Sequence, residues 1–220
     1  MKYTDFKLGQ AWDQPTKNIF NSFYKEIWED NEYDRHGILI EAGDIVVDLG
    51  ASIGIFSQYA ISKAASKVYS FECLDEHFKY LLENTKDTKS IVPIYGLISA
   101  DADGINFGSG VSNECKGLSL SRTSYNLENI FTSNKIDYVD FMKVDIEGFE
   151  YDFLLNANDV YFNKVKKWAI ELHVWGMYRN TADEYIKVMQ LIEKFTLNGY
   201  KVYCEQIHKN MCLYMLYASK

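Results

Sequence analysis

The sequence predicts an α/β protein built on a mostly parallel β-sheet with helices on both of its faces. Between residues 45 and 99, predicted strands alternate with predicted helices over short connections, which is the pattern of such a sheet. The first strong strand, 45–49, breaks at Gly50, and a helix follows it. Near the C-terminus, strands at about 200–207 and 211–218 are too close in sequence for a parallel crossover. We therefore expect an antiparallel hairpin at the sheet edge.

Residues 1–35 are predicted to form a helical extension, and residues 36–220 the main domain. Apolar side chains recur at spacings of three and four residues in the extension, which predicts an amphipathic helix from about residue 16 to residue 30. Such a helix fits two compatible roles: packing on the edge of the domain, or covering a pocket as a lid.

The elements of the main domain follow in a regular order. After the strand at 45–49 and a helix at about 54–65, further strands are predicted at 67–72, 91–99, 140–145 and 168–173. Asp75 is expected to cap the helix after the second strand, and the inner face of that helix to carry Phe78, Leu81 and Leu82.

The segment from 101 to about 125 interrupts this order. It is rich in glycine and serine, with a short strand predicted only at 104–107, and connections of this length are usually functional or mobile. A short helix at about 126–131 and another after Gly148 follow, the latter carrying Phe149, Phe153 and Leu154. A capping box at 181–184 begins the last helix, whose buried residues are predicted to be Tyr185, Val188, Met189, Ile192 and Phe195.

Composition narrows the class of protein. The net charge of −8 and the absence of a Lys/Arg stripe argue against nucleic acid as the main partner. The four cysteines form no C-x-x-C pair, so no zinc site is predicted. No apolar run reaches the length of a membrane span, and the first residues lack the apolar core of a signal peptide. We expect a soluble, cytoplasmic protein with no membrane partner.

Acidic residues end several of the predicted strands. Asp48, Glu72 and Asp145 end three of them, and Glu171 and His173 lie at the end of a fourth. Ligands of open parallel sheets bind at this edge. Glu72 is placed to accept both hydroxyls of a ribose, and the turn at Gly50 to receive a negative group on backbone N–H groups. Because Asp48 favours a ligand with an amine or sulfonium beside its carboxylate, the set fits S-adenosylmethionine.

Two other ligand chemistries use the same turn. Residues 50–54 match the G-x-S-x-G elbow of serine hydrolases, with Ser52 as nucleophile. Against this, the elbow follows the first strong strand, and no oxyanion loop precedes it. A dinucleotide site would need G-x-G-x-x-G, but Ser52 takes the middle position and Gly54 comes one residue early.

These segments together resemble class I S-adenosylmethionine-dependent methyltransferases, and among them the FkbM-like family. The resemblance covers roughly residues 33 to 175 and rests on 31–34, 47–54, 68–72, 96–104, 141–150 and 170–173. It implies a Rossmann-like, doubly wound sheet of seven strands with an antiparallel last strand. It also implies that S-adenosylmethionine is the methyl donor, and that a hydroxyl of a sugar, polyketide or other small metabolite is O-methylated. The donor residues it implies are Asp48, Gly50, Ala51, Ser52, Gly54, Glu72, Cys73 and Asp145.

The chain departs from the family pattern in two places. Cys73 stands where the family usually has proline, so the loop beside the adenine is expected to be looser. The segment 106–126 has little family likeness, so the choice of acceptor, a small molecule or saccharide, cannot be carried over. A protein that binds the donor without methylating anything also stays open.

Methylation of a hydroxyl requires a group that removes its proton. His173 is the predicted base, with Glu171 holding its tautomer, and Asp145 orients the acceptor or the donor amine. Asp145 and Glu147 lie on the same side of the chain and could take a divalent ion. We interpret Glu147 as a cap of the following helix, however, and predict no metal.

Overall fold

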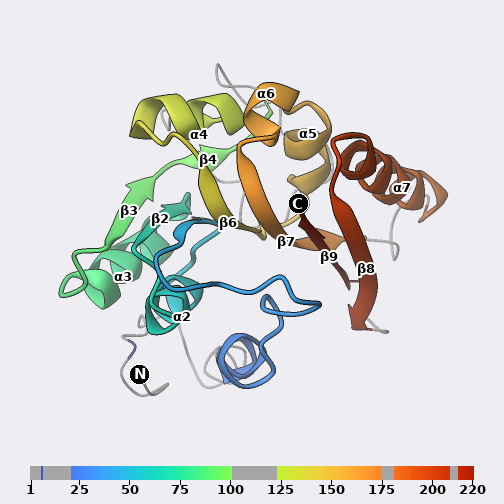
Figure 1. Ribbon diagram of the computed structural model, residues 1–220. Coiled ribbons are helices and arrows are strands. Elements are labelled where there is room, and N and C mark those ends of the chain that lie inside the picture. Colours follow the sequence, from blue (N-terminus) through green and yellow to red (C-terminus); the bar gives the residue numbers. More distant parts are fainter. Residues whose placement is uncertain (1–5, 7–20, 101–122, 175–180, 209–212) are drawn as a thin grey trace.

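The computed structural model describes residues 6, 21–100, 123–174, 181–208 and 213–220 (Figure 1). Seven strands form the main sheet in the order β3-β2-β1-β6-β7-β9-β8. Their bounds are β1 Ile45–Leu49, β2 Lys67–Glu72, β3 Ile91–Tyr95, β6 Val139–Val144, β7 Val165–His173, β8 Lys201–His208 and β9 Leu213–Ser219. The pairs from β3 to β7 are parallel, whereas β9 lies antiparallel between β7 and β8. The predicted Rossmann-like sheet with its C-terminal hairpin is confirmed.

Helices lie on both faces of this sheet. They are α2 Ile55–Ser62, α3 Asp75–Thr85, α4 Leu127–Asn134, α5 Glu150–Leu155, α6 Asp159–Phe162 and α7 Thr181–Leu197. Successive side chains of β1 enter different cores: Val47 and Leu49 join the cluster with α4 to α7, and Val46 joins the cluster with α2. This alternation is the period of a strand whose two faces are both covered.

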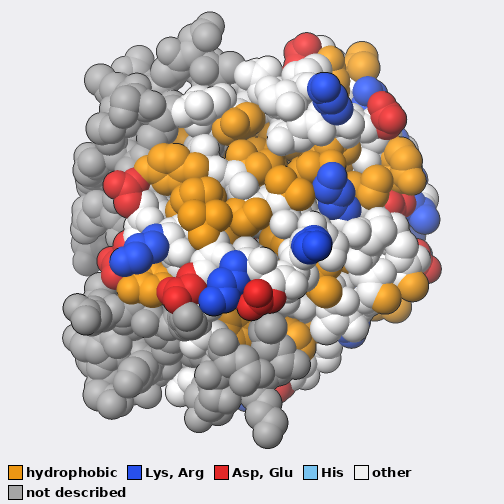
Figure 2. Space-filling view, turned by 90° about the vertical axis from the view of Figure 1, so that its left-hand side faces the viewer, with side chains coloured by type: hydrophobic (Ala, Val, Ile, Leu, Met, Phe, Trp, Pro, Cys, Tyr) orange, Lys and Arg blue, Asp and Glu red, His pale blue; other side chains and the backbone are white. Residues whose placement is uncertain are grey.

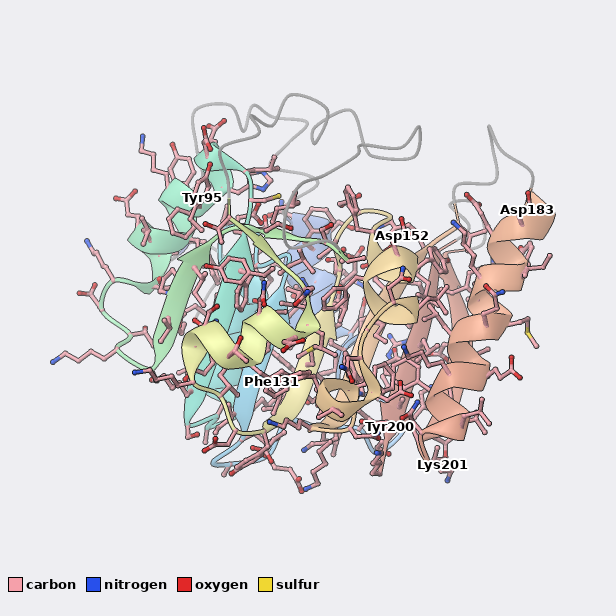
Figure 3. All side chains as sticks on the ribbon, turned by 90° about the horizontal axis from the view of Figure 1, so that it is seen from above. Tyr95, Phe131, Asp152, Asp183, Tyr200 and Lys201 are labelled. Atoms are coloured by element: carbon pink, nitrogen blue, oxygen red, sulfur yellow. The ribbon has the colours of Figure 1, made fainter. Side chains whose placement is uncertain are left out.

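Figure 3 views the molecule from the side of α4, α5 and α7, which lie in front of the sheet. In this view Tyr95, at the end of β3, lies at the upper edge of the sheet, and Lys201, at the start of β8, lies at the lower edge. The upper edge is therefore the one where the parallel strands end, and the turns that follow β1, β2 and β6 leave the sheet there.

The third strand is shorter than predicted. The strand ends at Tyr95, and Leu97–Ile98 (β4) pairs instead with Ser124–Tyr125 (β5) in a separate two-stranded parallel sheet. Gly96 makes the break possible, because a Cβ there would lie 2.4 Å from the ring of Tyr125. The prediction over 91–99 was wrong in this respect because the apolar pattern continues through the break.

Two helix predictions also need correction. The N-cap of α3 is Leu74, and Asp75 is its first helical residue rather than its cap. On α3 the side chain of Leu82 is 47% exposed, whereas Leu81 is buried. On α7 the buried side chains include Val188, Leu191 and Phe195, while Tyr185 and Met189 face outward. The actual stripe is narrower than the predicted one. The segment 104–107 and the side chain of Thr181 lie outside what the structure describes.

The last residues of the predicted N-terminal extension pack against α2. Residues 25–29 form a π-helix, η2 (Lys25–Glu29). Tyr24 stacks on Trp28 with ring centroids 5.6 Å apart, and Trp28 meets Tyr59 of α2 edge-on at 5.5 Å. This contact agrees with the edge-packing role; the lid role stays a prediction, and residues 16–20 lie outside the described chain.

Two further features concern the apolar residues outside the core. No helix in the described ranges combines the length and apolar composition needed to cross a bilayer. On the side of the molecule where β3 forms the sheet edge, hydrophobic side chains gather in a broad patch between scattered charged groups (Figure 2).

Candidate active site

The turn after β1 is held in close contact with the end of β6. Gly50 has a φ of +79°, and a Cβ at this position would lie 1.8 Å from the carbonyl oxygen of Asp145. Only glycine fits this approach. Ser52 also has a positive φ, of 49°, and Gly54, with a φ of 94°, is the N-cap of α2. The chain therefore forms a tight loop after β1, and this loop packs directly against the end of β6.

The carboxylate of Glu72 organises this turn from the neighbouring strand. Its Oε2 accepts the N–H of Ser52 at 2.8 Å, and its Oε1 accepts the N–H groups of Cys73 and Leu74 at 2.8 and 2.7 Å. The side chain is only 6% exposed. Glu72 thus lies where the sequence placed it, and its role toward a ribose stays a prediction.

We predicted that the N–H groups of the turn would receive a ligand, but several of them donate to carbonyl groups inside the protein. Gly50 and Ala51 both donate to the carbonyl oxygen of Phe71, at 3.1 and 2.9 Å, and Gly54 donates to that of Ala51 at 2.8 Å. A ligand can reach these N–H groups only by competing with bonds inside the protein.

Asp48 faces the protein's own ammonium group. Its carboxylate is fully buried; Oδ2 accepts the hydroxyl of Ser57 at 2.6 Å, and Oδ1 lies 3.3 Å from Nζ of Lys143. Lys143 also donates to the carbonyl of Gly50 at 2.7 Å and lies 3.3 Å from Oδ2 of Asp145. Lys143 was not among the predicted site residues, although a lysine within a strand buried on both faces indicates a carboxylate partner.

Burial and neighbouring charges shift the pKa values of Asp48 and Lys143 in opposite directions. Burial raises the pKa of Asp48, and Lys143 works against that rise. Burial by itself lowers the pKa of Lys143, but the attraction of Asp145 and Asp48 is larger and raises it. Lys143 therefore keeps its charge and connects β1, the glycine turn and β6. The predicted contact of Asp48 with a ligand amine stays a prediction.

A second group of polar side chains lies at the ends of β6 and β7. The hydroxyl of Tyr33 contacts Oδ2 of Asp145 at 3.3 Å and Oε2 of Glu171 at 2.9 Å. Burial, together with Asp145, raises the pKa of Glu171 to about 8, and burial and the same acids raise the pKa of Tyr33. Two of the predicted catalytic acids are thus brought together by a tyrosine that the sequence analysis did not single out.

We predicted that Glu171 would orient His173, but the structure shows Glu150 in that role. Nδ1 of His173 lies 3.0 Å from Oε1 of Glu150, whereas Oε1 of Glu171 lies 4.0 Å from Nε2. Burial alone lowers the pKa of His173, but Glu150 outweighs it and raises the pKa to about 10. The ring is therefore an imidazolium at neutral pH in this state, which differs from the neutral base that we expected.

Glu147 does not cap α5. The N-cap of α5 is Phe149, and the nearby N–H groups of Ile146 and Gly148 donate to Glu150. Glu147 has a φ of 56°, and its Oε2 lies 3.6 Å from Nε2 of His173. Our interpretation of Glu147 as the cap was wrong, because Phe149 holds the N-cap position and Glu147 lies two residues before it.

Comparison with known proteins decides the family. Residues 48–202 match the model of the methyltransferase FkbM domain, which includes the glycine turn, Glu72 and the Asp145–His173 group. The chain belongs to the FkbM methyltransferase family. The suspected resemblance is thereby confirmed.

Individual relatives match only in part. The chain is 24% identical over 68% of its length to the AMB antimetabolite synthetase AmbE of Pseudomonas aeruginosa, and covers 9% of that protein. It is 39% identical over 28% of its length to the 31-O-demethyl-FK506 methyltransferase FkbM of Streptomyces tacrolimicus, and covers 24% of that protein. The chain therefore spans less than a quarter of the length of each.

Solved structures share the fold. Fibrillarin of Aeropyrum pernix, solved with natively bound S-adenosyl-L-methionine, matches 81% of this chain and 67% of its own chain, with a TM-score of 0.51 and 14% identity. An identity this low shows a common fold and nothing of the donor or the acceptor.

Proposed function

We propose that the protein transfers a methyl group from S-adenosylmethionine to a hydroxyl of a small molecule, such as a sugar, a polyketide or another metabolite. One observation carries the proposal: the Glu72-held glycine turn and the Asp145–Glu171–His173 group lie at the same edge of four adjacent strands. A donor bound at the first group would present its methyl toward the second. Membership of the FkbM family supports the reaction type.

The donor side comprises the glycine turn at residues 50–54 and Glu72 at the end of the neighbouring strand β2. In this proposal the ribose hydroxyls bind to Glu72, and the remaining contacts come from Gly50, Ala51, Ser52, Gly54 and Cys73. Asp48 acts through Lys143, which ties the turn to Asp145. Because Glu72 already accepts three N–H groups, its oxygens are fixed in position before the donor arrives.

The acceptor side comprises the carboxylates at the ends of β6 and β7. The acceptor oxygen attacks the methyl carbon while the carbon–sulfur bond breaks, and the donor leaves as a neutral thioether. The hydroxyl proton passes to a carboxylate of this group, that of Asp145 or Glu171, because the ring of His173 already carries its proton in this state. The hydroxyl of Tyr33 lies within hydrogen-bond distance of both acids, which supports an acceptor hydroxyl binding between them. The acidic net charge of −8 supports a small acceptor over RNA.

Calorimetric titration with S-adenosylmethionine tests the donor side. Glu72→Ala should lose donor binding, whereas Glu76→Ala, an exposed acid on the first turn of α3, should bind like the wild type. Wild-type affinity in Glu72→Ala would refute the donor site. His173→Ala should keep donor binding and lose turnover with hydroxylated acceptors; donor binding in the wild type with no methylated product from any of them would indicate a binding protein instead.

The hydrolase alternative loses support from the family assignment and from the geometry. The ring near Ser52 is that of His77, with Nδ1 3.4 Å from Oγ, whereas His173 lies in the group with Glu147 and Glu150. A serine-reactive phosphonate should leave the protein unlabelled at Ser52, and labelling there would contradict the methyl-transfer proposal.

A further inference from the structure

Three side chains at the ends of β6 and β7 form a set of metal-ligand type. Asp145, Glu147 and His173 each offer one ligand atom, and these atoms lie within 4.8 Å of one another. Asp145 follows β6, Glu147 lies on the next turn, and His173 ends β7. The set combines two carboxylate oxygens with one imidazole nitrogen and contains no sulfur, a composition that suits a divalent ion of intermediate hardness.

Glu150 holds these three side chains in position. Its side chain is fully buried; Oε1 contacts Nδ1 of His173 at 3.0 Å and accepts the N–H of Ile146 at 3.0 Å, and both oxygens accept the N–H of Gly148 at 3.1 Å. One carboxylate therefore holds the turn that carries two of the ligands and also orients the ring of the third. Metal-binding histidines characteristically have such a carboxylate on the nitrogen that does not bind the metal.

The orientation of the ring directs Nε2 at the acids. With Nδ1 on Glu150, Nε2 lies 3.6 Å from Oε2 of Glu147 and 4.0 Å from Oε1 of Glu171. Tyr33 and Lys143 both reach Asp145 through the same oxygen, Oδ2, so neither of these contacts uses Oδ1. His173 is only 4% exposed and Glu147 is 48% exposed, which leaves the set open toward the side of Glu147.

The local charge favours a cation. The carboxylates of Asp48, Asp145, Glu147 and Glu150 surround the two cationic side chains Lys143 and His173. Carboxylates gathered in this way repel one another unless a cation or hydrogen bonds join them. A bound dication would offset the remaining negative charge at the place where the acids are closest.

We propose that Asp145, Glu147 and His173 bind one divalent first-row cation such as Mn²⁺. The ion takes the place of the proton on Nε2 of His173, and that proton is released to solvent. Ligand atoms in cis positions of an octahedral ion lie about 3 Å apart, so the set closes slightly, chiefly by movement of the half-exposed Glu147. The other positions hold water or the acceptor hydroxyl. This last role, in which the ion lowers the pKa of the hydroxyl, rests on the proposed methyl transfer.

Titration of the chelator-treated full chain with Mn²⁺ tests the site, with free Mn²⁺ followed by electron paramagnetic resonance. We expect one Mn²⁺ per chain, and affinity at least tenfold weaker in Glu147→Gln and in His173→Gln. Glu193→Gln, which makes the same change at an exposed position on α7, should bind Mn²⁺ like the wild type. Glu150→Gln should weaken binding by about 10- to 100-fold through the orientation of the ring.

Absence of Mn²⁺ binding in the wild type, or affinity unchanged in both Glu147→Gln and His173→Gln, would overturn the proposal. Because Glu147 is half-exposed, its variant keeps the fold, and retained S-adenosylmethionine binding in that variant verifies it. Parallel titrations separate the two proposals. Donor binding without Mn²⁺ binding would overturn the metal site alone, and Mn²⁺ binding without donor binding would overturn the methyl-transfer function alone.

Discussion

Replacing Gly50 with alanine should destabilise the protein far more than the same change at Gly37. Both glycines have nearly the same backbone conformation, with φ of +79° and +78°. Each variant therefore pays a similar cost for a side chain in the left-handed region, about 1–2 kcal/mol. The two positions differ in their surroundings, because no described atom lies within 4 Å of a Cβ at Gly37.

The additional cost at Gly50 follows from its contact with β6. Its new Cβ would lie 1.8 Å from the carbonyl oxygen of Asp145, so one of the two segments has to move by more than about 1 Å to reach a van der Waals separation. That movement breaks the bond from the N–H of Asp145 to the carbonyl of Leu49, now 3.1 Å, and the bond from Lys143 to the carbonyl of Gly50, now 2.7 Å. Together these losses add about 2–4 kcal/mol.

Urea unfolding followed by far-ultraviolet circular dichroism measures the difference. We expect Gly37→Ala to lower the free energy of unfolding by about 1–2 kcal/mol and Gly50→Ala by about 3–6 kcal/mol, with similar slopes against urea concentration. If the two variants differ by less than about 1 kcal/mol, the contact between the turn and β6 does not have the energetic weight that the geometry assigns to it.

Three more predictions follow from buried polar groups. Lys143→Met leaves two carboxylates without their cation and should destabilise the protein by about 3–5 kcal/mol in urea unfolding, against almost no change for the exposed Lys79→Met; equal losses would contradict the role of the ion pairs. Burial, and to a smaller extent the nearby charge of Glu26, raises the pKa of Glu32 from 4.5 to about 7. Between these pH values the folded chain holds a proton that the unfolded chain has released, so the free energy of unfolding falls as the pH rises. Glu32→Gln should therefore gain about 1–2 kcal/mol over the wild type at pH 8 but little at pH 5, and a gain independent of pH would speak against the raised pKa. Tyr33→Phe should keep donor binding and lower turnover about tenfold, the equivalent of one hydrogen bond to a charged group; unchanged turnover would show that this hydroxyl is not needed.

The sheet was predictable because each strand carries its own local signals. The segments of β1, β2, β6 and β7 are apolar runs bounded by turns or acids, and the short link between β8 and β9 allows only a hairpin. The end of β3 was not predictable in this way. Leu97 and Ile98 are as apolar as the strand before them, and only the tertiary contact of Gly96 with Tyr125 shows that they leave the sheet.

The site was predictable in position but not in its pairings. Strand ends gather at one edge, so the sequence was sufficient to place Asp145, Glu171 and His173 there. It did not show which carboxylate His173 contacts, because that depends on the conformation of the turn at 145–148, where Glu147 has a positive φ. Spacing along a strand determines the face of a side chain, whereas the choice between two nearby acids is made by the loops.

The pairing of Asp48 with Lys143 has a consequence for how the sheet assembles. The two residues are direct partners in the parallel register of β1 and β6. Both strands are apolar on both faces, so hydrophobic patterning alone specifies their alignment weakly. A slip by one residue would place Lys143 opposite Val47 or Leu49 and bury an ammonium and a carboxylate apart from each other. The ion pair therefore selects one alignment of the central strands during folding and penalises the others, and the glycine turn and the acids beyond it meet only in that alignment.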